Sequence, residues 1–185
     1  MTFIEPQTDR VPYLCIQEVL NSDVTLILAG YELLNESMET GALEDLDSFW
    51  ETISPATDTA VRPKLVCATF RGNVIGFAVG AYLRNLNMGF NAYSAVKKSW
   101  RDRGVYMSMR RHLIDLFNKE ALLDVLGNEP MGNNLNDHQI FYVIAELQKH
   151  SRLFRRYIRE WEAFVVPCAY EQPQVQGLNS KSLQL

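Results

Sequence analysis

The 185-residue chain is 47% hydrophobic and 22% charged, which is typical of an ordinary globular protein. Its three cysteines lie far apart in apolar runs and lack metal-ligand spacing, and their odd number argues against a disulfide framework. This cysteine usage fits a reducing compartment, so we expect a cytoplasmic protein. The longest apolar run, residues 74–83, is too short for a membrane helix of about 20 residues.

No basic stretch followed by an apolar one opens the chain, so we expect no signal peptide. A chain of this length most simply forms one domain over residues 1–185. We expect its core over about residues 11–172, followed by a flexible polar tail over residues 173–185.

The charge is distributed unevenly, although the net charge is only −4. Residues 1–60 carry twelve acidic side chains and one basic side chain, whereas the remainder carries seventeen basic and ten acidic ones. This asymmetry suits a protein that meets a cation on one side and an anion on the other. It equally suits two solvated faces.

Hydrophobic periodicity predicts a strand, two amphipathic helices and a meander of strands in the first half of the chain. Asp23 is a candidate helix cap, and Arg71-Gly72-Asn73 predicts a tight hairpin between two apolar runs. The expected segments are a strand over 13–19, helices over 24–34 and 43–53, and strands over 64–70, 74–83 and 88–96.

The second half predicts alternating helices and strands. We expect a helix that begins near Gly104, with apolar positions at helical spacing as far as Phe117. A long polar connection over about 124–137, a strand over 139–147, a helix over 150–161 and a strand over 163–169 follow. The order predicts an α+β fold of three layers, in which helices flank a mixed, mostly antiparallel central sheet.

The most informative stretch runs from Ser94 to Phe117. An extended run is followed by a polar loop with Lys97, Lys98, Arg101 and Arg103, and the amphipathic helix begins near Gly104. The first turn of a helix leaves four N–H groups unpaired and carries partial positive charge, so this arrangement predicts an anion site suited to a pyrophosphate. A solvated basic loop is the alternative.

This stretch resembles the acyl-CoA-binding segment of the GNAT superfamily of N-acetyltransferases. The family pattern is Arg or Gln, two residues, Gly, one residue, then Gly or Ala. Arg101 and Gly104 match it, whereas Tyr106 stands where a small residue is usual. The resemblance implies acetyl-CoA as co-substrate, bound by Val96, Lys97, Arg101, Asp102, Arg103, Gly104, Val105 and Tyr106.

The order of elements is similar to that of the family over roughly residues 11–172. Residues 157–173 resemble the end of some members, where a helix that bears a tyrosine precedes a strand closing in Tyr-x-Gln-Pro. Tyr170, Gln172 and Pro173 stand at that end, and Ala163-Phe164 replaces the usual Gly-Phe.

The resemblance implies direct transfer of an acetyl group to a primary amine of a small molecule or peptide, without a covalent enzyme intermediate. It implies that the thioester lies between the strands over 88–96 and 139–147. Tyr157 is then the candidate proton donor to the leaving thiolate, and Glu146 a candidate for orienting or deprotonating the amine. Because helices 24–34 and 43–53 are acidic, we expect a cationic acceptor.

Several alternatives stay open on the sequence. The chain is also compatible with a catalytically silent GNAT-like domain that binds acyl-CoA or a protein partner. The basic face of helix 150–161 suggests nucleic-acid binding less strongly, since the whole chain is acidic, and we expect no nucleic-acid partner.

His112 is expected to be a packed side chain, and His138 and His150 are weaker candidates for a base. We expect no metal, and a homodimer is possible.

Overall fold

The computed structural model describes residues 14–39, 41–54, 60–128, 139–145, 147–148, 152–160, 163, 165 and 183–184. Contacts divide the chain into two compact units, Met1–Val143 and Ile144–Leu185. A single domain over residues 1–185 stays a prediction.

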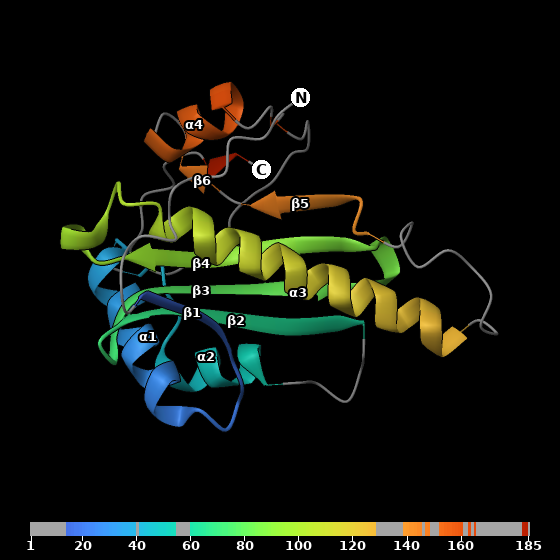
Figure 1. The fold of residues 1–185 in the computed structure, drawn as a ribbon, viewed down its shortest axis with the longest axis horizontal. Helices are drawn as coiled ribbons and strands as arrows, with labels where there is room; N and C mark the ends of the chain where they lie inside the picture. Colours follow the sequence, from blue (N-terminus) through green and yellow to red (C-terminus); the bar gives the residue numbers. More distant parts are fainter. Residues whose placement is uncertain are drawn as a thin grey trace. The chain divides into compact units, whose positions relative to one another are not determined.

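The first unit is built on a sheet with the strand order β1-β2-β3-β4-β5, whose last strand spans the boundary between the two units (Figure 1). The pairings among its first four strands are antiparallel, whereas β5 runs in the direction of β4, so the sheet is mixed as predicted. The elements are β1 (Leu14–Val19), α1 (Val24–Ser37), α2 (Leu46–Ile53), β2 (Val61–Phe70), β3 (Asn73–Leu83), η2 (Arg84–Leu86), β4 (Met88–Val96), η3 (Lys98–Trp100), α3 (Val105–Asn128) and β5 (Tyr142–Ala145).

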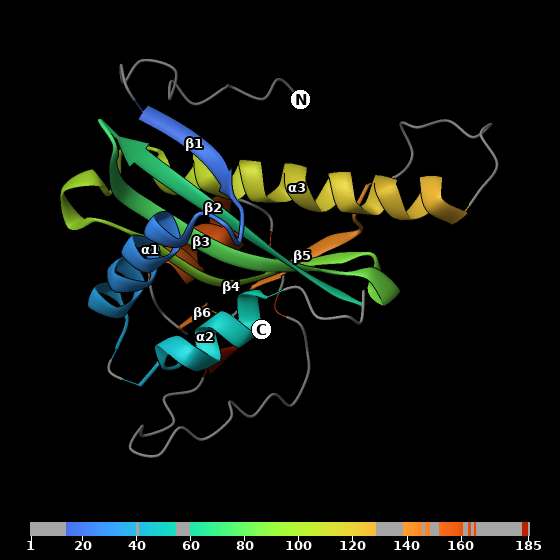
Figure 2. The ribbon, with the colours of Figure 1, turned by 90° about the horizontal axis from the view of Figure 1, so that it is seen from below.

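Helices cover both faces of this sheet, as expected for a three-layer fold (Figure 2). On one face, α1 and α2 enclose a cluster centred on Leu34, Phe49 and Phe77, all of which are fully buried. On the other face, α3 packs Met109 and Phe117 onto a second cluster. The amphipathic patterns in the sequence therefore correspond to two separate cores on opposite faces of one sheet.

The central helix is longer than predicted. It continues to Asn128, whereas the sequence predicted a polar connection from residue 124. Asp124 is held by Arg62 and Arg84, and Glu120 by Arg62 and Lys64, so ion pairs to the sheet side extend the helix beyond its apolar stripe. Residues 129–138 of the predicted connection lie outside the described part of the chain.

The strand expected over residues 139–147 is also different. Its first residues are held by two asparagines, because Ile140 N–H donates to Asn118 Oδ1 and Phe141 N–H donates to the Asn87 carbonyl, both at 3.0 Å. Only Tyr142–Ala145 forms β5, and Leu147–Gln148 forms a separate strand, β6.

In the second unit, β6 pairs with β7 (Leu183–Gln184), and α4 covers Arg152–Glu160, close to the predicted helix. Within the tail that the sequence predicts to be flexible, Leu183–Gln184 forms antiparallel backbone pairing with β6, and residues 173–182 and 185 lie outside the described part of the chain. Ala163 and Val165 belong to no strand, and the remainder of the strand predicted over 163–169 lies outside the described residues.

Candidate functional site

The segment between β4 and α3 forms a compact loop at the end of the sheet. Lys97 N–H donates to the Ile75 carbonyl at 2.9 Å, which continues the pairing with β3 by one residue. The chain then makes one 3-10 turn, closed by a 2.8 Å bond from Trp100 N–H to the Lys97 carbonyl. Asp102 and Gly104 adopt positive φ angles of 60° and 80°, and at these two residues the chain changes direction before it enters α3.

Gly104 is the residue at which the helix begins. Its carbonyl accepts the first helical hydrogen bond, from Ser108 N–H at 3.0 Å, so the amides of the first turn of α3 have no acceptor within the helix. A φ of 80° is readily adopted by glycine and strained for a side chain with a Cβ. The backbone conformation at this position therefore favours the glycine that the sequence places there.

Apolar packing anchors this helix end on the sheet. Val105 and Met109 are buried against β3, where a Cβ added to Gly76 would lie only 2.8 Å from Met109 Sδ. The absence of a side chain at Gly76 therefore allows α3 to approach the sheet and holds its N-terminus in place.

Arg101 has a second use that the sequence did not reveal. Its Nε–H donates to the Val96 carbonyl at 3.0 Å and so ties the loop to the last residue of β4. This bond uses one of the five N–H donors of the guanidinium group. The arginine expected to bind phosphate thus also supports the shape of the loop that would present it.

The residues predicted to bind the co-substrate divide into buried and exposed side chains. Val96 and Val105 are buried in the α3-side cluster, and Tyr106 is half-buried and packs against the same cluster. The Tyr106 ring therefore packs partly into the core at the position where the family has a small residue. The remaining side chains of the predicted set are exposed, namely Lys97, Arg101, Asp102 and Arg103.

A β-bulge in β4 lies just before this loop and was missed by the sequence analysis. Val79 faces Tyr93 and Gly80 faces Asn91, so Ala92 has no partner on β3. Ser94 Oγ donates to Asn91 Oδ1 at 3.1 Å across the bulge. A bulge releases backbone groups from the regular ladder and bends the strand, and it is common beside active sites. Nothing in the alternation of residues 88–96 indicates where the register shifts.

The predicted catalytic residues are not brought together with the loop by the described structure. Glu146 lies outside the described residues, as do His138 and His150. Tyr157 lies in α4, in the second unit, where its side chain is 7% exposed and its carbonyl accepts a hydrogen bond from Ala163 N–H at 3.0 Å. Their catalytic roles therefore stay predictions. His112 is half-buried on α3, which agrees with a packed side chain.

The junction between α1 and α2 holds a partly buried carboxyl group. Glu44 accepts a hydrogen bond from Thr52 Oγ1 at 3.3 Å, whereas its Oε1 is buried without a hydrogen-bond partner in the described structure. Burial raises the pKa of Glu44 above its ordinary value, the Thr52 hydroxyl opposes this shift, and the Asp45 charge adds to it. Asp45 caps α2 through Ser48 N–H.

A pocket of about 250 Å³ lies between α1 and the β2–β3 turn. Glu32 and Glu36 line it from α1, and Lys97 lines it from the end of β4. The acidic helix and the basic loop therefore meet at one pocket, although the two glutamates are exposed.

None of the described helices is both long enough and apolar enough to cross a membrane. No group of three or more His, Cys, Asp or Glu side chains in the described part of the chain is placed to hold a metal ion.

Comparison with known proteins gives matches in structure only. No protein-family model and no curated protein matches the chain. A protein from Bacteroides thetaiotaomicron named as a GNAT-family acetyltransferase aligns with a TM-score of 0.59 and 16% identity, covering 92% of this chain and 84% of its own. An aminoglycoside acetyltransferase from an uncultured soil sample aligns with a TM-score of 0.55 and 14% identity, covering 91% and 97%.

The ribosomal-protein alanine N-acetyltransferase of Escherichia coli aligns with a TM-score of 0.54 and 13% identity, covering 82% of this chain and 80% of its own. At such identities the likeness concerns the fold, and it extends over most of the chain on both sides. The predicted resemblance is confirmed at this level: the chain has the fold of the GNAT acetyltransferases.

Proposed function

We propose that the protein is an acetyl-CoA-dependent N-acetyltransferase that transfers an acetyl group directly to a primary amine. One observation carries the proposal. The bulged strand β4 leads through a basic loop to Gly104, whose backbone has a positive φ and lies at the N-terminus of α3. Open helix amides, exposed cations and a glycine without a Cβ together fit the pyrophosphate of coenzyme A.

Each residue of the loop has a distinct part in this proposal. Val96 and Val105 are buried and contribute through their backbone, whereas Lys97, Arg101 and Arg103 supply positive charge. The amides at Gly104, Val105 and Tyr106 are the donors at the helix end. Asp102, with its positive φ, shapes the loop that leads into the helix.

Acetyl transfer requires the amine to lose a proton and the thiolate to gain one, while a bond from nitrogen to the acetyl carbon replaces the carbon–sulfur bond. Glu146 is proposed to orient or deprotonate the amine, and Tyr157 to donate the proton to the thiolate. A phenol hydroxyl can donate its proton as negative charge develops on sulfur. Cys67 takes no part, since burial raises the pKa of its thiol to about 12.

The acceptor is proposed to be a cationic amine. The first sixty residues carry twelve carboxylates, and two of them, Glu32 and Glu36, line the pocket beside Lys97. A surface of one sign concentrates ligands of the opposite sign. One structural neighbour is named as an aminoglycoside acetyltransferase, which is consistent with an amine acceptor here.

The first experiment asks whether the protein binds and turns over acetyl-CoA. Thermal shift with acetyl-CoA tests binding, and release of free thiol over a panel of diamines, lysine-like compounds and neutral amines tests turnover. We expect both, with diamines preferred and the preference weakened by salt. Binding without turnover on any acceptor would favour the alternative of a silent acyl-CoA-binding domain, and no binding would contradict both.

The role of Tyr157 is tested by Tyr157→Phe, which removes the hydroxyl and keeps the ring. General acid catalysis contributes about 100- to 10,000-fold, so we expect kcat to fall at least about tenfold with acetyl-CoA affinity nearly unchanged. Tyr142→Phe, which changes a phenol 59% exposed in β5, is the matched control. Unchanged kcat in Tyr157→Phe, with chemistry shown to be rate-limiting, would assign Tyr157 to packing.

A further inference from the structure

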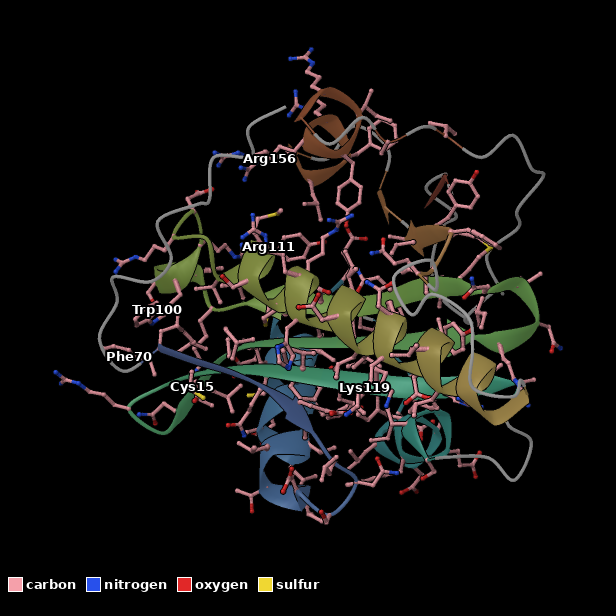
Figure 3. The ribbon with its side chains drawn as sticks, turned by 45° about the vertical axis from the view of Figure 1, so that its right-hand side comes forward. Cys15, Phe70, Trp100, Arg111, Lys119 and Arg156 are labelled. Atoms are coloured by element: carbon pink, nitrogen blue, oxygen red, sulfur yellow. The ribbon has the colours of Figure 1, made fainter. Side chains whose placement is uncertain are left out.

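Two aromatic rings and two arginines form a cluster at the end of the sheet, beside the basic loop. Phe70 from the end of β2 and Trp100 from η3 lie side by side (Figure 3), with ring centroids 4.7 Å apart and a tilt of 48°. The Arg71 guanidinium lies over the Phe70 ring at 5.4 Å, and that of Arg103 over the Trp100 ring at 5.3 Å. We call these four residues the arginine–aromatic cluster.

Stacking of this kind leaves the guanidinium groups suited to an anion. An arginine that lies flat on an aromatic ring interacts through its face, so its N–H groups remain at its edge. The edge of a guanidinium matches two oxygens of a phosphate group. The rings also restrict the side chains, which reduces the entropy lost when a ligand binds.

Arg71 occupies a backbone position that arginine rarely adopts. It has a φ of 50° and precedes Gly72, with a φ of 78°, in the two-residue turn between β2 and β3. Two consecutive positive φ angles are typical of a type I′ turn, in which asparagine and glycine are preferred. An arginine at the first position therefore strains the backbone, and such strain often accompanies function.

The cluster also adjoins the proposed co-substrate site directly. Arg103 precedes Gly104, the residue that opens the end of α3, and Trp100 ends the 3-10 turn of the same loop. A ligand held at Gly104 by a pyrophosphate therefore has the cluster within reach of its neighbouring groups. Coenzyme A carries one further phosphate, a monoester at the 3′ position of its ribose.

We infer that the arginine–aromatic cluster is a subsite for a phosphate monoester, and that it takes the ribose 3′-phosphate of coenzyme A. The assignment rests on the proposed binding of acetyl-CoA and adds a residue from the β2–β3 turn, Arg71, to the basic loop. Arg71 and Arg103 each supply N–H donors to the dianion. Phe70 and Trp100 support the two guanidinium groups from behind.

The test compares acetyl-CoA with 3′-dephospho-acetyl-CoA by calorimetric titration of the intact chain and three variants. Arg71→Asn removes the guanidinium and places a residue suited to the type I′ turn. Arg71→Lys keeps the charge without the planar edge. Lys119→Gln removes an exposed cation farther along α3 (Figure 3) and serves as the matched control.

We expect the wild type to bind acetyl-CoA at least about tenfold more tightly than the 3′-dephospho compound. In Arg71→Asn this ratio should fall to about two or less, with affinity for the 3′-dephospho compound unchanged and the melting temperature equal or higher. Arg71→Lys should give an intermediate ratio, and Lys119→Gln the wild-type ratio. A purely structural role for Arg71 predicts a lower melting temperature in Arg71→Asn with the ratio intact.

The outcomes separate this inference from the proposed function. A wild type that binds both compounds equally, or an Arg71→Asn variant that keeps the ratio, overturns the subsite while acetyl-CoA binding stands. A wild type that binds neither compound overturns the proposed function and the subsite with it. Stabilisation by inorganic phosphate that depends on Arg71, in a wild type indifferent to the 3′-phosphate, would overturn the assignment to coenzyme A.

Discussion

The two ends of α3 use arginine and lysine in opposite ways. Near its C-terminus, Arg62, Lys64 and Arg84 reach Glu120 and Asp124, whose side chains are both 12% exposed. Lys64 Nζ lies 2.6 Å from Glu120 Oε1, and Arg62 Nη1 lies 2.7 Å from Glu120 Oε2. At this end Arg62, Lys64 and Arg84 each pair with a carboxylate, and these charges hold the helix on the sheet.

At the N-terminal end the cations are not neutralised in this way. Lys97, Lys98, Arg101 and Arg103 form no ion pair with a carboxylate in the part of the chain that the structure describes. Arg101 contacts a carbonyl and Arg103 an aromatic ring instead. The helix end is held by buried Val105 and Met109, so its positive charge remains available to a ligand. The charges at the C-terminal end of α3 therefore stabilise the fold, whereas those at its N-terminal end are suited to binding a ligand.

The largest effect is expected from Gly104→Val at the N-terminal end. A branched side chain at a φ of 80° strains the backbone by roughly 1–3 kcal/mol and also blocks the approach of phosphate to the helix amides. We expect acetyl-CoA no longer to raise the melting temperature. Gly41→Val, at a φ of 81° outside this loop, is the matched control for strain.

The control should lose comparable stability and keep its response to acetyl-CoA. If Gly104→Val and Gly41→Val respond to acetyl-CoA to the same degree, the helix end is not the phosphate site.

Arg101→Ala is expected to have the next largest effect. Loss of a charge-assisted contact with phosphate costs about 1.5–3 kcal/mol, which corresponds to roughly 10- to 150-fold in affinity for acetyl-CoA. Loss of the Nε bond to the Val96 carbonyl adds to this effect because the loop is less well held. Calorimetric titration measures it, with Arg111→Ala, an exposed arginine of α3, as control (Figure 3). Equal affinities in the two variants would contradict a specific role for Arg101.

The sequence predicted the N-terminal end of α3 better than its C-terminal end, for a physical reason. A strand, a basic loop, a glycine and an apolar stripe are all local patterns, so Val96, Gly104 and the start of the helix were placed correctly. The end of α3 depends on Arg62, Lys64 and Arg84, which lie about 40 to 60 positions earlier in the chain. Partners that distant leave no local signal, and the helix was therefore predicted to end too early.

The same distinction applies to the candidate site. The bulge at Ala92 arises from the register between β3 and β4, and the Arg101–Val96 bond from the three-dimensional path of the loop. Neither is visible in residue types along the strand. Likewise, the pairing of Leu183–Gln184 with Leu147–Gln148 joins the end of the strand predicted over 139–147 to a two-residue stretch of the tail that no periodicity marks as a strand.

Glu120→Gln tests the structural end of the comparison and is expected to act on stability alone. Burial by itself would raise the pKa of Glu120, but hydrogen bonds from Lys64 and Arg62 and their charges hold it below the ordinary value of 4.5. We expect the variant to lose about 1–3 kcal/mol of unfolding free energy at pH 7, because two cations lose a charged partner. Affinity for acetyl-CoA should be unchanged.

The pH dependence follows from the direction of that shift. A carboxyl group whose folded pKa lies below its unfolded value contributes stability above about pH 4.5, and this contribution is lost as the pH falls through the folded pKa. The difference in melting temperature between wild type and Glu120→Gln should therefore shrink on acidification. A difference that stays constant down to pH 3 would show that the network contributes through packing and not through charge.

The smallest effect, of opposite sign, is expected from Glu44→Gln on the other face of the sheet. Burial raises the pKa of Glu44 above 4.5, and its Oε1 lacks a hydrogen-bond partner in the described structure. A carboxyl group with a raised folded pKa favours folding only below about pH 4.5, and this contribution is lost as the pH rises through the folded pKa. Replacing the carboxylate by a neutral amide should therefore leave the melting temperature at pH 7 equal or slightly higher, with a gain that disappears toward pH 4.

Thermal melts across this range measure the effect of Glu44→Gln, with Glu51→Gln, at an exposed residue of α2, as control. A lower melting temperature at pH 7 in Glu44→Gln alone would mean that a donor stabilises the charged carboxylate in the folded protein. Glu44 would then resemble Glu120, a paired structural charge, and the contrast between the two carboxylates would be lost.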